Sequence, residues 1–336
     1  MTRQRNDRAG FTLLELLVVL GIMALLAAIS ISALARFKQS SNEKFTDIQL
    51  RKAHTGLVQQ YQGAVDAIKK ETPPDYIINL TKHANGQKDM ARARALHLKL
   101  RLRQEFPQTF NEVDPTIWNA EFRPALLALA AADPANPQAG AQAAARYAPK
   151  PQFQMAIGSA GNDPNLESAA LLHMILSQSR AGSNFDVESV GKVTPWQIGN
   201  RQLKVFVDYF DTPVAFRRWA DRLDPADIPA ELSQAPYSVV SAKVPNARDP
   251  EDPDGRLGSD PAVAQDWLPG GYNLAVRLFV PASNNPNLRP SFTAPTPHPF
   301  DGNHRGPYVF SAGKDQAYGD EADLLSYRLQ QSGKGN

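Results

Sequence analysis

The chain has 336 residues, of which 42% are hydrophobic, and a formal net charge of +2. These values allow one membrane-spanning helix and one or two modest soluble domains, and they give no overall bias toward nucleic acid. Cysteine is absent, which excludes disulfides, thiol catalysis and cysteine metal sites, so packing or bound ions must hold the fold.

The first expected element is an apolar helix from Phe11 to Ala35. As a helix, this segment would be about 37 Å long, which exceeds the roughly 30 Å of a bilayer core. Its stretch "AAISISALA" could serve as a signal-peptide cleavage site, but the apolar region is longer than that of an ordinary signal. We therefore predict a spanning segment at residues 11–35.

One carboxylate, Glu15, interrupts this apolar segment near its start. A charge inside a spanning helix costs several kcal/mol and by default marks a function with a specific partner. The alternative is that Glu15 reaches the lipid headgroups because it lies near the end of the segment.

A basic leader at residues 1–10 ends in Gly10 and is followed by "FTLLELLVVLGIMALLAAI", with Phe11 directly after the glycine and Glu15 four residues later. This arrangement resembles the N-terminus of type IV pilins and type II secretion pseudopilins. The resemblance implies that a prepilin peptidase cuts between Gly10 and Phe11 and methylates the new amine. It also implies a role for Glu15 in assembly, in which its carboxylate neutralises the Phe11 ammonium of a neighbouring subunit.

Residues 36–73 are expected to continue the helix past the membrane as an amphipathic segment, which the prolines at 73 and 74 would end. Apolar side chains recur there at helical spacing, and we expect this face to pack on the protein's own sheet. The residues of the face are Phe45, Ile48, Leu57, Tyr61, Val65 and Ile68.

Residues 74–194 read as a helical and loop-rich insertion. Its basic stretch "KDMARARALHLKLRLRQEF" alternates leucines like a strand, but its composition favours helix, which we predict. Its cations would form a solvated face, or less commonly meet DNA phosphates. Residues 131–151 are rich in alanine and proline and predict a linker or loop. "NLESAALLHMILSQS" predicts a buried helix capped by Asn165 or Ser168.

Residues 195–336 are expected to form an antiparallel sheet. A hairpin is predicted from Leu203 to Trp219, with further strands at Tyr272–Val280, Pro307–Ala312 and Leu324–Arg328. The predicted fold class is therefore α+β: a long N-terminal helical spine, transmembrane and then amphipathic, packed on a C-terminal antiparallel sheet, with a helical and loop insertion.

The stretch "SAGKDQAYGDEADLLSY" carries four carboxylates, Asp315, Asp320, Glu321 and Asp323, between two predicted strands. Unneutralised, these groups repel, and a calcium ion with six to eight oxygen ligands would relieve the repulsion. The stretch resembles the calcium-binding loop near the C-terminus of major pseudopilins, from which it departs at Gln316 and Ala322. The alternative is a solvated acidic turn without an ion.

The resemblance implies a pseudopilin subunit that sits in the inner membrane by a single helix, with its soluble domain in the periplasm. After cleavage and N-methylation it would join a type II secretion-like fibre that drives protein export. Its implied partners are other pilin or pseudopilin subunits, the prepilin peptidase, the inner-membrane assembly platform and membrane lipid. The large tip pseudopilin is a further candidate, but that subunit lacks the glutamate that this chain has as Glu15.

Three other interpretations stay open. The chain could be a minor pilin of a type IV pilus, an adhesive or DNA-uptake subunit, or a membrane-anchored hydrolase. We do not expect nucleic acid as a partner, and we do not expect an enzyme, because the six histidines form no HExxH motif and no serine lies in a full G-x-S-x-G frame.

Overall fold

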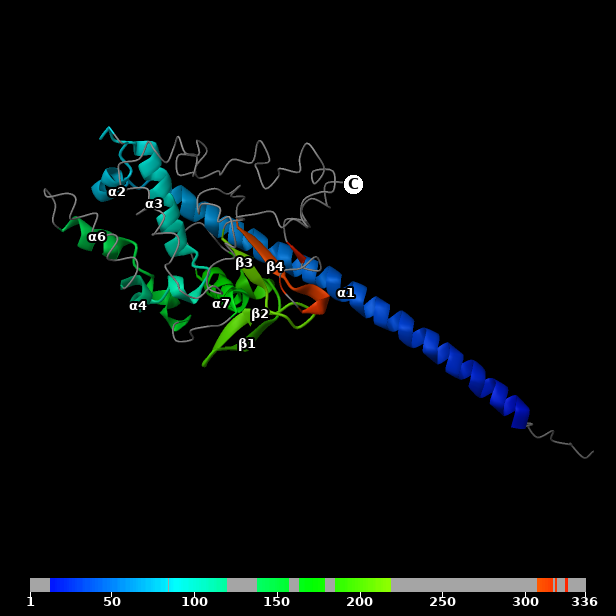
Figure 1. Cartoon of the computed structure of the whole chain (residues 1–336). Helices are drawn as coiled ribbons and strands as arrows, with labels where there is room; N and C mark the ends of the chain where they lie inside the picture. The colour runs from blue at the N-terminus through cyan, green and yellow to red at the C-terminus, as the bar shows by residue number, and fades with distance from the viewer. Residues whose placement is uncertain are drawn as a thin grey trace, which may run out of the picture. The chain divides into compact units, whose positions relative to one another are not determined.

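The computed structural model describes residues 13–83, 85–119, 138–156, 163–178, 185–218, 307–316, 318 and 324–325. The chain divides into two compact units, Met1–Thr46 and Asp47–Asn336. In the described part of the chain, the first unit is helical, and the second holds the remaining helices and the strands (Figure 1). A long N-terminal helix followed by antiparallel sheets confirms the predicted α+β class.

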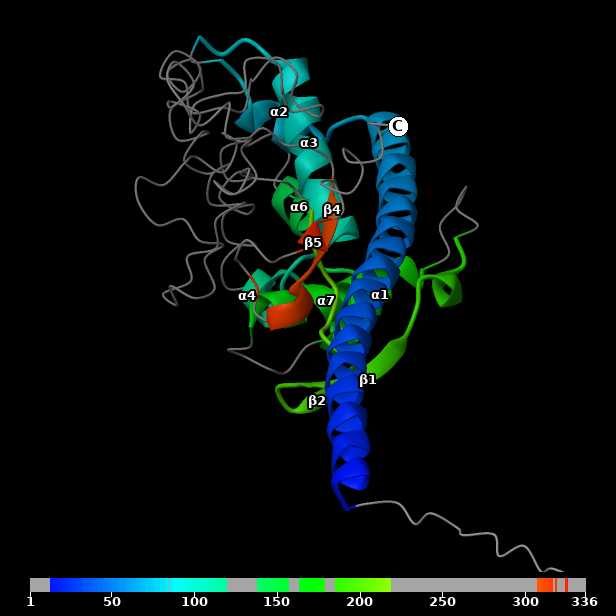
Figure 2. The same ribbon diagram turned by 90° about the vertical axis from the view of Figure 1, so that its right-hand side faces the viewer.

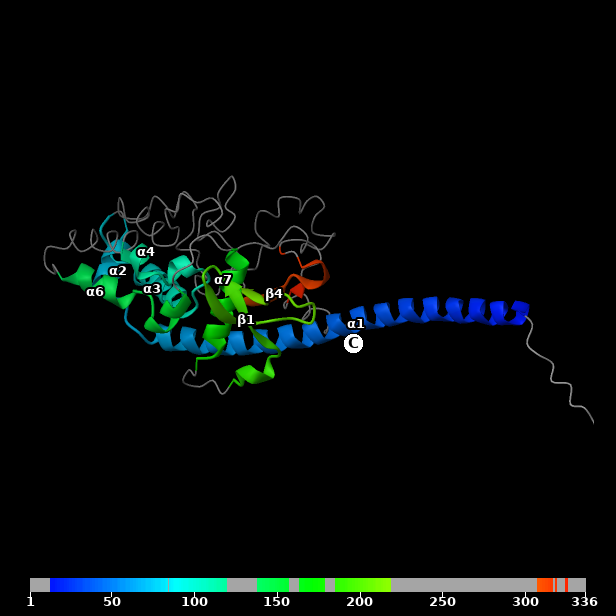
Figure 3. The ribbon, with the colours of Figure 1, turned by 90° about the horizontal axis from the view of Figure 1, so that it is seen from below.

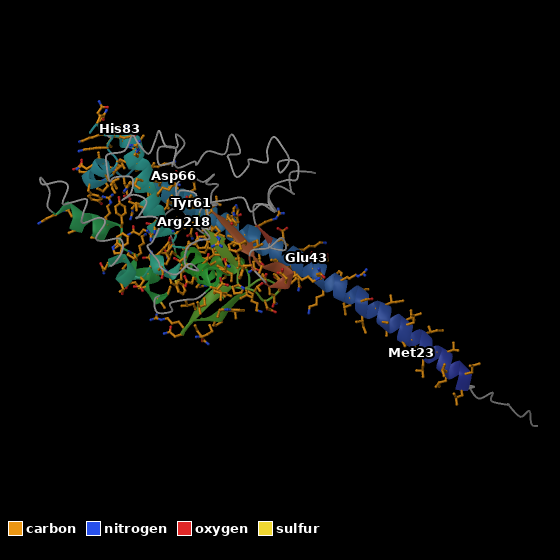
Figure 4. All side chains as sticks on the ribbon, in the orientation of Figure 1. Met23, Glu43, Tyr61, Asp66, His83 and Arg218 are labelled. Atoms are coloured by element: carbon orange, nitrogen blue, oxygen red, sulfur yellow. The ribbon has the colours of Figure 1, made fainter. Side chains whose placement is uncertain are left out.

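The first helix, α1 (Leu13–Lys69), runs through 57 residues and is about 85 Å long. Its N-terminal part is long and apolar enough to cross a membrane, and its large apolar side chains are exposed, including that of Met23 (Figure 4). The helix ends shortly before the prolines at 73 and 74, which were predicted to end it. The residue before a proline avoids the helical conformation. Pro74 instead takes an extended conformation and precedes the next helix.

The C-terminal part of α1 buries one face in the hydrophobic core. This face comprises Leu50, Ala53, Leu57, Tyr61, Val65 and Ile68. The last four of these were predicted, but the predictions for Phe45 and Ile48 were wrong, because these side chains are 47% and 49% exposed. Ile48 lies two positions before Leu50, which is more than half a turn around the helix and places the two on opposite sides.

The second unit continues with α2 (Asp75–Leu80), α3 (Met90–Glu105) and α6 (Ala139–Arg146), and α2 packs against both of the others. Figures 1 and 3 show these helices gathered at the C-terminal end of α1. The helix prediction for α3 is confirmed. The loop predicted over residues 131–151 is wrong for α6, where repeated alanines favour helix over coil. Short turns connect these elements: η1 (Phe110–Glu112), α4 (Pro115–Ile117) and η3 (Pro151–Ala156).

Three of the five cations of α3 are buried instead of facing solvent as predicted. Arg92, Lys99 and Arg103 are only 2%, 1% and 7% exposed. Glu112 receives a bidentate pair of hydrogen bonds from Arg218, at 2.8 and 2.9 Å, and lies 3.4 Å from Arg103. Burial raises the pKa of Glu112, but the charges of the two arginines lower it more, so its net pKa lies below the ordinary value. The carboxylate therefore stays ionised inside the fold.

Helix α7 (Pro164–Leu176) is the predicted buried helix, and it packs against β2 and β3. Its cap is Asp163, whose side chain accepts a hydrogen bond from the Asn165 amide, so the predicted caps Asn165 and Ser168 were wrong. Ser168 is instead fully buried, and its hydroxyl both donates to the carbonyl and accepts from the amide of Phe216. This exchange fixes β3 onto α7.

The described strands form two antiparallel sheets. In the first, β1 (Val193–Ile198) pairs with β2 (Arg201–Phe206) after the turn η4 (Val187–Ser189), with Ile198 opposite Arg201. The second has the order β3 (Ala215–Arg217), β4 (Tyr308–Ser311) and β5 (Leu324–Leu325). Figure 2 shows α7 between the β1–β2 hairpin and the group formed by α3 and α6.

The hairpin predicted from Leu203 to Trp219 forms only next to its turn. Its first half pairs with β1, which was not predicted, and its second half pairs with β4. Within the described residues, the two halves are joined by the bridge of Val207 with Pro213 and by hydrogen bonds from the backbone amides of Asp208 and Val214 to the carbonyls of Thr212 and Phe206. The strand predictions at 307–312 and 324–328 are confirmed over β4 and over the two residues of β5. The strand predicted at 272–280 lies outside the described residues.

Two glycines of α1 give a matched test of how this helix packs. A Cβ added at Gly56 would lie 2.4 Å from the ring of Phe185, whereas one added at Gly63 would meet nothing within 4 Å. We expect Gly56→Ala to destabilise the protein by about 1 to 2 kcal/mol through overpacking, and Gly63→Ala to stabilise it by about 0.5 to 1 kcal/mol through helix propensity. Thermal unfolding of both variants measures this, and equal shifts would contradict the Phe185 contact.

Candidate functional site

The N-terminal segment contains three of the predicted site residues. Gly10 and Phe11 lie outside the described residues. Glu15 lies on the helical backbone of α1, and the structure does not describe its side chain. The neighbouring leucines at positions 13, 14, 16 and 17 are between 57% and 82% exposed. This part of α1 therefore offers an apolar surface that suits membrane anchoring.

The predicted calcium loop follows β4, and the end of β4 is hydrogen-bonded to the turn after β2. The key group of this turn is the carboxylate of Asp208, which is 1% exposed. Its Oδ1 accepts from the amides of Phe210 and Thr212, at 2.8 and 2.9 Å, and its Oδ2 accepts from the hydroxyls of Thr212 and Ser311. Four hydrogen bonds compensate the cost of burying this carboxylate and connect the turn to β4.

Two further hydrogen bonds connect this turn to the segment after β4. The side-chain amide of Gln316 donates to the carbonyl of Phe210 at 2.8 Å, and the hydroxyl of Tyr318 donates to the carbonyl of Pro213. Gln316 holds the left-handed backbone conformation, with φ of 62°, and so turns the chain sharply after η7 (Gly313–Asp315). The bonds of Gln316 and Tyr318 therefore hold the start of the acidic loop against the turn after β2.

Of the four predicted calcium ligands, Asp315 is described, and its side chain is exposed in η7. The other three, Asp320, Glu321 and Asp323, lie outside the described residues. Among the residues that the structure describes, no group of three histidines or acidic residues is placed to hold a metal ion.

A third site, which the sequence analysis missed, lies at the C-terminal end of α1. His97 of α3 is 2% exposed, and its Nδ1 lies 2.5 Å from the hydroxyl of Tyr147 and its Nε2 3.2 Å from Glu71. Glu71 also accepts hydrogen bonds from Arg146, at 2.7 Å, and from Arg101, at 3.3 Å. These five residues, the Glu71 cluster, come from three separate parts of the sequence, at 71, at 97–101 and at 146–147, and no spacing rule connects these parts.

Burial and charge shift the acid–base properties of this cluster. Burial and the positive charge of Arg146 lower the pKa of His97 to about 4, against the opposing effect of Glu71. Burial raises the pKa of Glu71, but the Arg146 hydrogen bond and the Arg101 charge lower it more, so the net shift is downward. Near neutral pH, His97 is therefore neutral and Glu71 ionised.

The order tyrosine, histidine, glutamate is that of a nucleophile, its base and the group that orients the base. A nucleophile must, however, reach a substrate and ionise readily. Tyr147 is 3% exposed, and burial raises the pKa of its hydroxyl well above the ordinary value. The geometry therefore favours a structural role for the Glu71 cluster.

Comparison with known proteins supports the N-terminal site. Residues 5–31 match the family model of the prokaryotic N-terminal methylation motif, which is typical of type IV pilins and pseudopilins. No curated protein and no solved structure matches the chain. The matched range includes Gly10, Phe11 and Glu15 and continues into the apolar part of α1. This motif supports a type IV pilin-like protein.

Proposed function

We propose that the protein is a pseudopilin subunit of a type II secretion-like periplasmic fibre. It would enter the inner membrane through α1, lose its leader to the prepilin peptidase, be methylated at Phe11 and join the fibre through the assembly platform. The observation that carries this proposal is the methylation motif at residues 5–31, which continues into a single helix of 57 residues. Proteins with this motif are structural, which also favours a subunit over an enzyme.

The anchored acidic loop favours a pseudopilin over the other pilin-like functions. Its sequence resembles the calcium loop of major pseudopilins, and the buried Asp208 connects the start of this loop to the turn after β2. The second candidate is a minor pilin of a type IV pilus, which the methylation motif supports equally well.

Deletion of the gene in its native host distinguishes the two candidates. We expect folded export substrates to accumulate in the periplasm while surface pili and twitching motility stay intact, and we expect a plasmid copy to restore export. A processing-defective copy with Gly10→Glu is the matched control, and it should fail to restore export. Loss of pili with normal export would assign the protein to a pilus instead.

We further propose that the acidic loop binds calcium. The donors present fit this ion, because four carboxylates give a set of hard oxygen ligands. When bound, calcium would neutralise their repulsion. Asp315, Asp320, Glu321 and Asp323 are the residues that would hold it, and the Asp208 turn would keep the start of the loop in place.

Removal of calcium should therefore lower the melting temperature of the full-length protein in detergent. Binding to the folded state alone adds about 2.7 kcal/mol at a hundredfold excess over Kd. Magnesium should substitute poorly, because it demands stricter octahedral geometry. Asp323→Ala should abolish the response, whereas Asp254→Ala, in a different acidic stretch, should leave it intact. Equal melting temperatures with calcium and with chelator would show that the carboxylates simply face water.

A further inference from the structure

Beside the Glu71 cluster lies a second buried tyrosine, Tyr76. The hydroxyl of Tyr76, in α2, is buried and has no hydrogen-bond partner among the described residues. Its ring meets that of Tyr147 edge to face, with 6.4 Å between centroids, and the two side chains shift each other's pKa. The polar groups therefore follow one another in the order Glu71, His97, Tyr147 and Tyr76.

The direction of the hydrogen bonds in this series depends on the protonation of His97. In the neutral ring, Nε2 donates to the Glu71 carboxylate, and Nδ1 accepts from the Tyr147 hydroxyl. In the protonated ring both nitrogens donate, so the Tyr147 oxygen must accept from Nδ1 and its own proton must turn elsewhere. The Tyr76 oxygen, which has no other partner among the described residues, can accept that proton.

Protonation also changes the balance of charge. With His97 neutral, the carboxylate of Glu71 faces two cations, Arg101 and Arg146, and Arg101 is partly balanced by Glu105 at 3.7 Å. A charged His97 adds a third cation around one carboxylate. The Arg146 side chain is 39% exposed and that of Arg101 only 19%, so Arg146 is the cation that can turn into water.

We propose that the Glu71 cluster is an acid-sensitive latch, which holds α6 at the end of α1 while His97 is neutral and releases α6 when His97 gains a proton. Arg146 is the last residue of α6, and Tyr147 follows it directly, so both contacts of the latch connect this helix to Glu71 and His97. Release is the opening that follows protonation, and in it the Arg146–Glu71 bond, the reversed His97–Tyr147 bond and the hydrogen bonds from the Gln104 side chain to the carbonyls of Arg146 and Ala148 are lost.

Proton linkage gives the size and sign of the effect of pH on the stability of the closed latch. In the closed latch the pKa of His97 is about 4, and in the open latch it returns to the ordinary 6.5. The open state therefore binds more protons between these values, so the closed state is favoured above pH 6.5 and loses stability as pH falls toward 4. From pH 8 to pH 5, the open fraction should rise about thirtyfold.

Hydrogen exchange of the full-length protein in detergent micelles, read by mass spectrometry, tests the latch. After correction for the intrinsic exchange rate, the protection of amides in residues 139–147 should fall about thirtyfold between pH 8 and pH 5. His97→Gln should make this protection independent of pH. The control is His173→Gln, in α7, where burial also lowers the histidine pKa but the ring contacts Phe206, so the response of α6 should persist.

A second variant tests the order of the side chains without removing the histidine. Tyr76→Phe deletes only the oxygen that would accept the Tyr147 proton, so protonated His97 should become less favourable and its pKa, measured by NMR of labelled histidine, should fall. Unchanged protection of α6 between pH 8 and pH 5 in the wild-type protein would overturn the proposal. So would an unchanged His97 pKa in Tyr76→Phe.

Discussion

The mature protein, purified from membranes, is expected to begin with N-methylated Phe11. We expect the peptidase implied by the motif at residues 5–31 to cut after Gly10 and to methylate the new amine. Because the cut precedes the apolar part of α1, the whole spanning segment should stay in the product. Mass spectrometry of the intact protein and of its N-terminal peptide measures the loss of residues 1–10 and the added methyl group.

Substitution of the glycine gives the control for this result. Gly10→Glu should leave the precursor uncut and inserted in the membrane, because the change removes the cleavage position without altering the apolar helix. Wild-type protein from cells without a prepilin peptidase should show the same precursor. An N-terminus near Ala35, as after ordinary signal cleavage, would contradict the pilin-like interpretation.

Glu15→Leu is expected to give protein that is inserted in the membrane but unassembled. Loss of the charge should leave insertion unharmed or improve it, because a carboxylate in a spanning helix is costly. In the fibre, the Phe11 ammonium of the neighbouring subunit would lose its counter-charge. If that ammonium is fully buried, the loss is on the order of 3 to 5 kcal/mol.

Sedimentation of sheared fibres and cross-linking in membranes measure fibre assembly and membrane insertion separately. The matched control is Ser32→Leu, which removes another polar group of α1, one whose hydroxyl bonds to the helix's own carbonyls at 28 and 29. This variant should insert and assemble. Normal fibres from Glu15→Leu would show that the carboxylate only reaches the headgroups.

The sequence allowed good prediction where one local signal decides the structure. The apolar run, its leader and the proline pair predict α1, and a short run of aromatic and β-branched residues predicts β4. The charges of α3 show the limit of this reasoning. Composition gives the helix, but whether Arg103 faces water depends on Glu112 and on the pairing of Glu112 with Arg218, which lies more than a hundred residues along the chain. Tertiary contacts of this kind leave no pattern in a single sequence.

The predicted hairpin, which forms only next to its turn, has a similar cause. Its two apolar runs and the intervening turn predict pairing between neighbours. The buried carboxylate of Asp208 instead bonds to Ser311, about a hundred residues later, and the second run joins β4. The Glu71 cluster was missed for the same reason, since a lone histidine in a basic helix gives no sign of the tyrosine and carboxylate that surround it.

The hydrogen bonds between Ser168 and the backbone of β3 have a consequence for how molecules of this protein associate. Strand β3 pairs with β4, and the amide and carbonyl of Phe216 are taken up by the Ser168 hydroxyl of α7. Free backbone groups on an outer strand are a template onto which a strand of another molecule can add. At Phe216 that template is closed by the Ser168 side chain, which protects this part of the sheet against edge-to-edge aggregation in addition to the charge of Arg217 in the same strand.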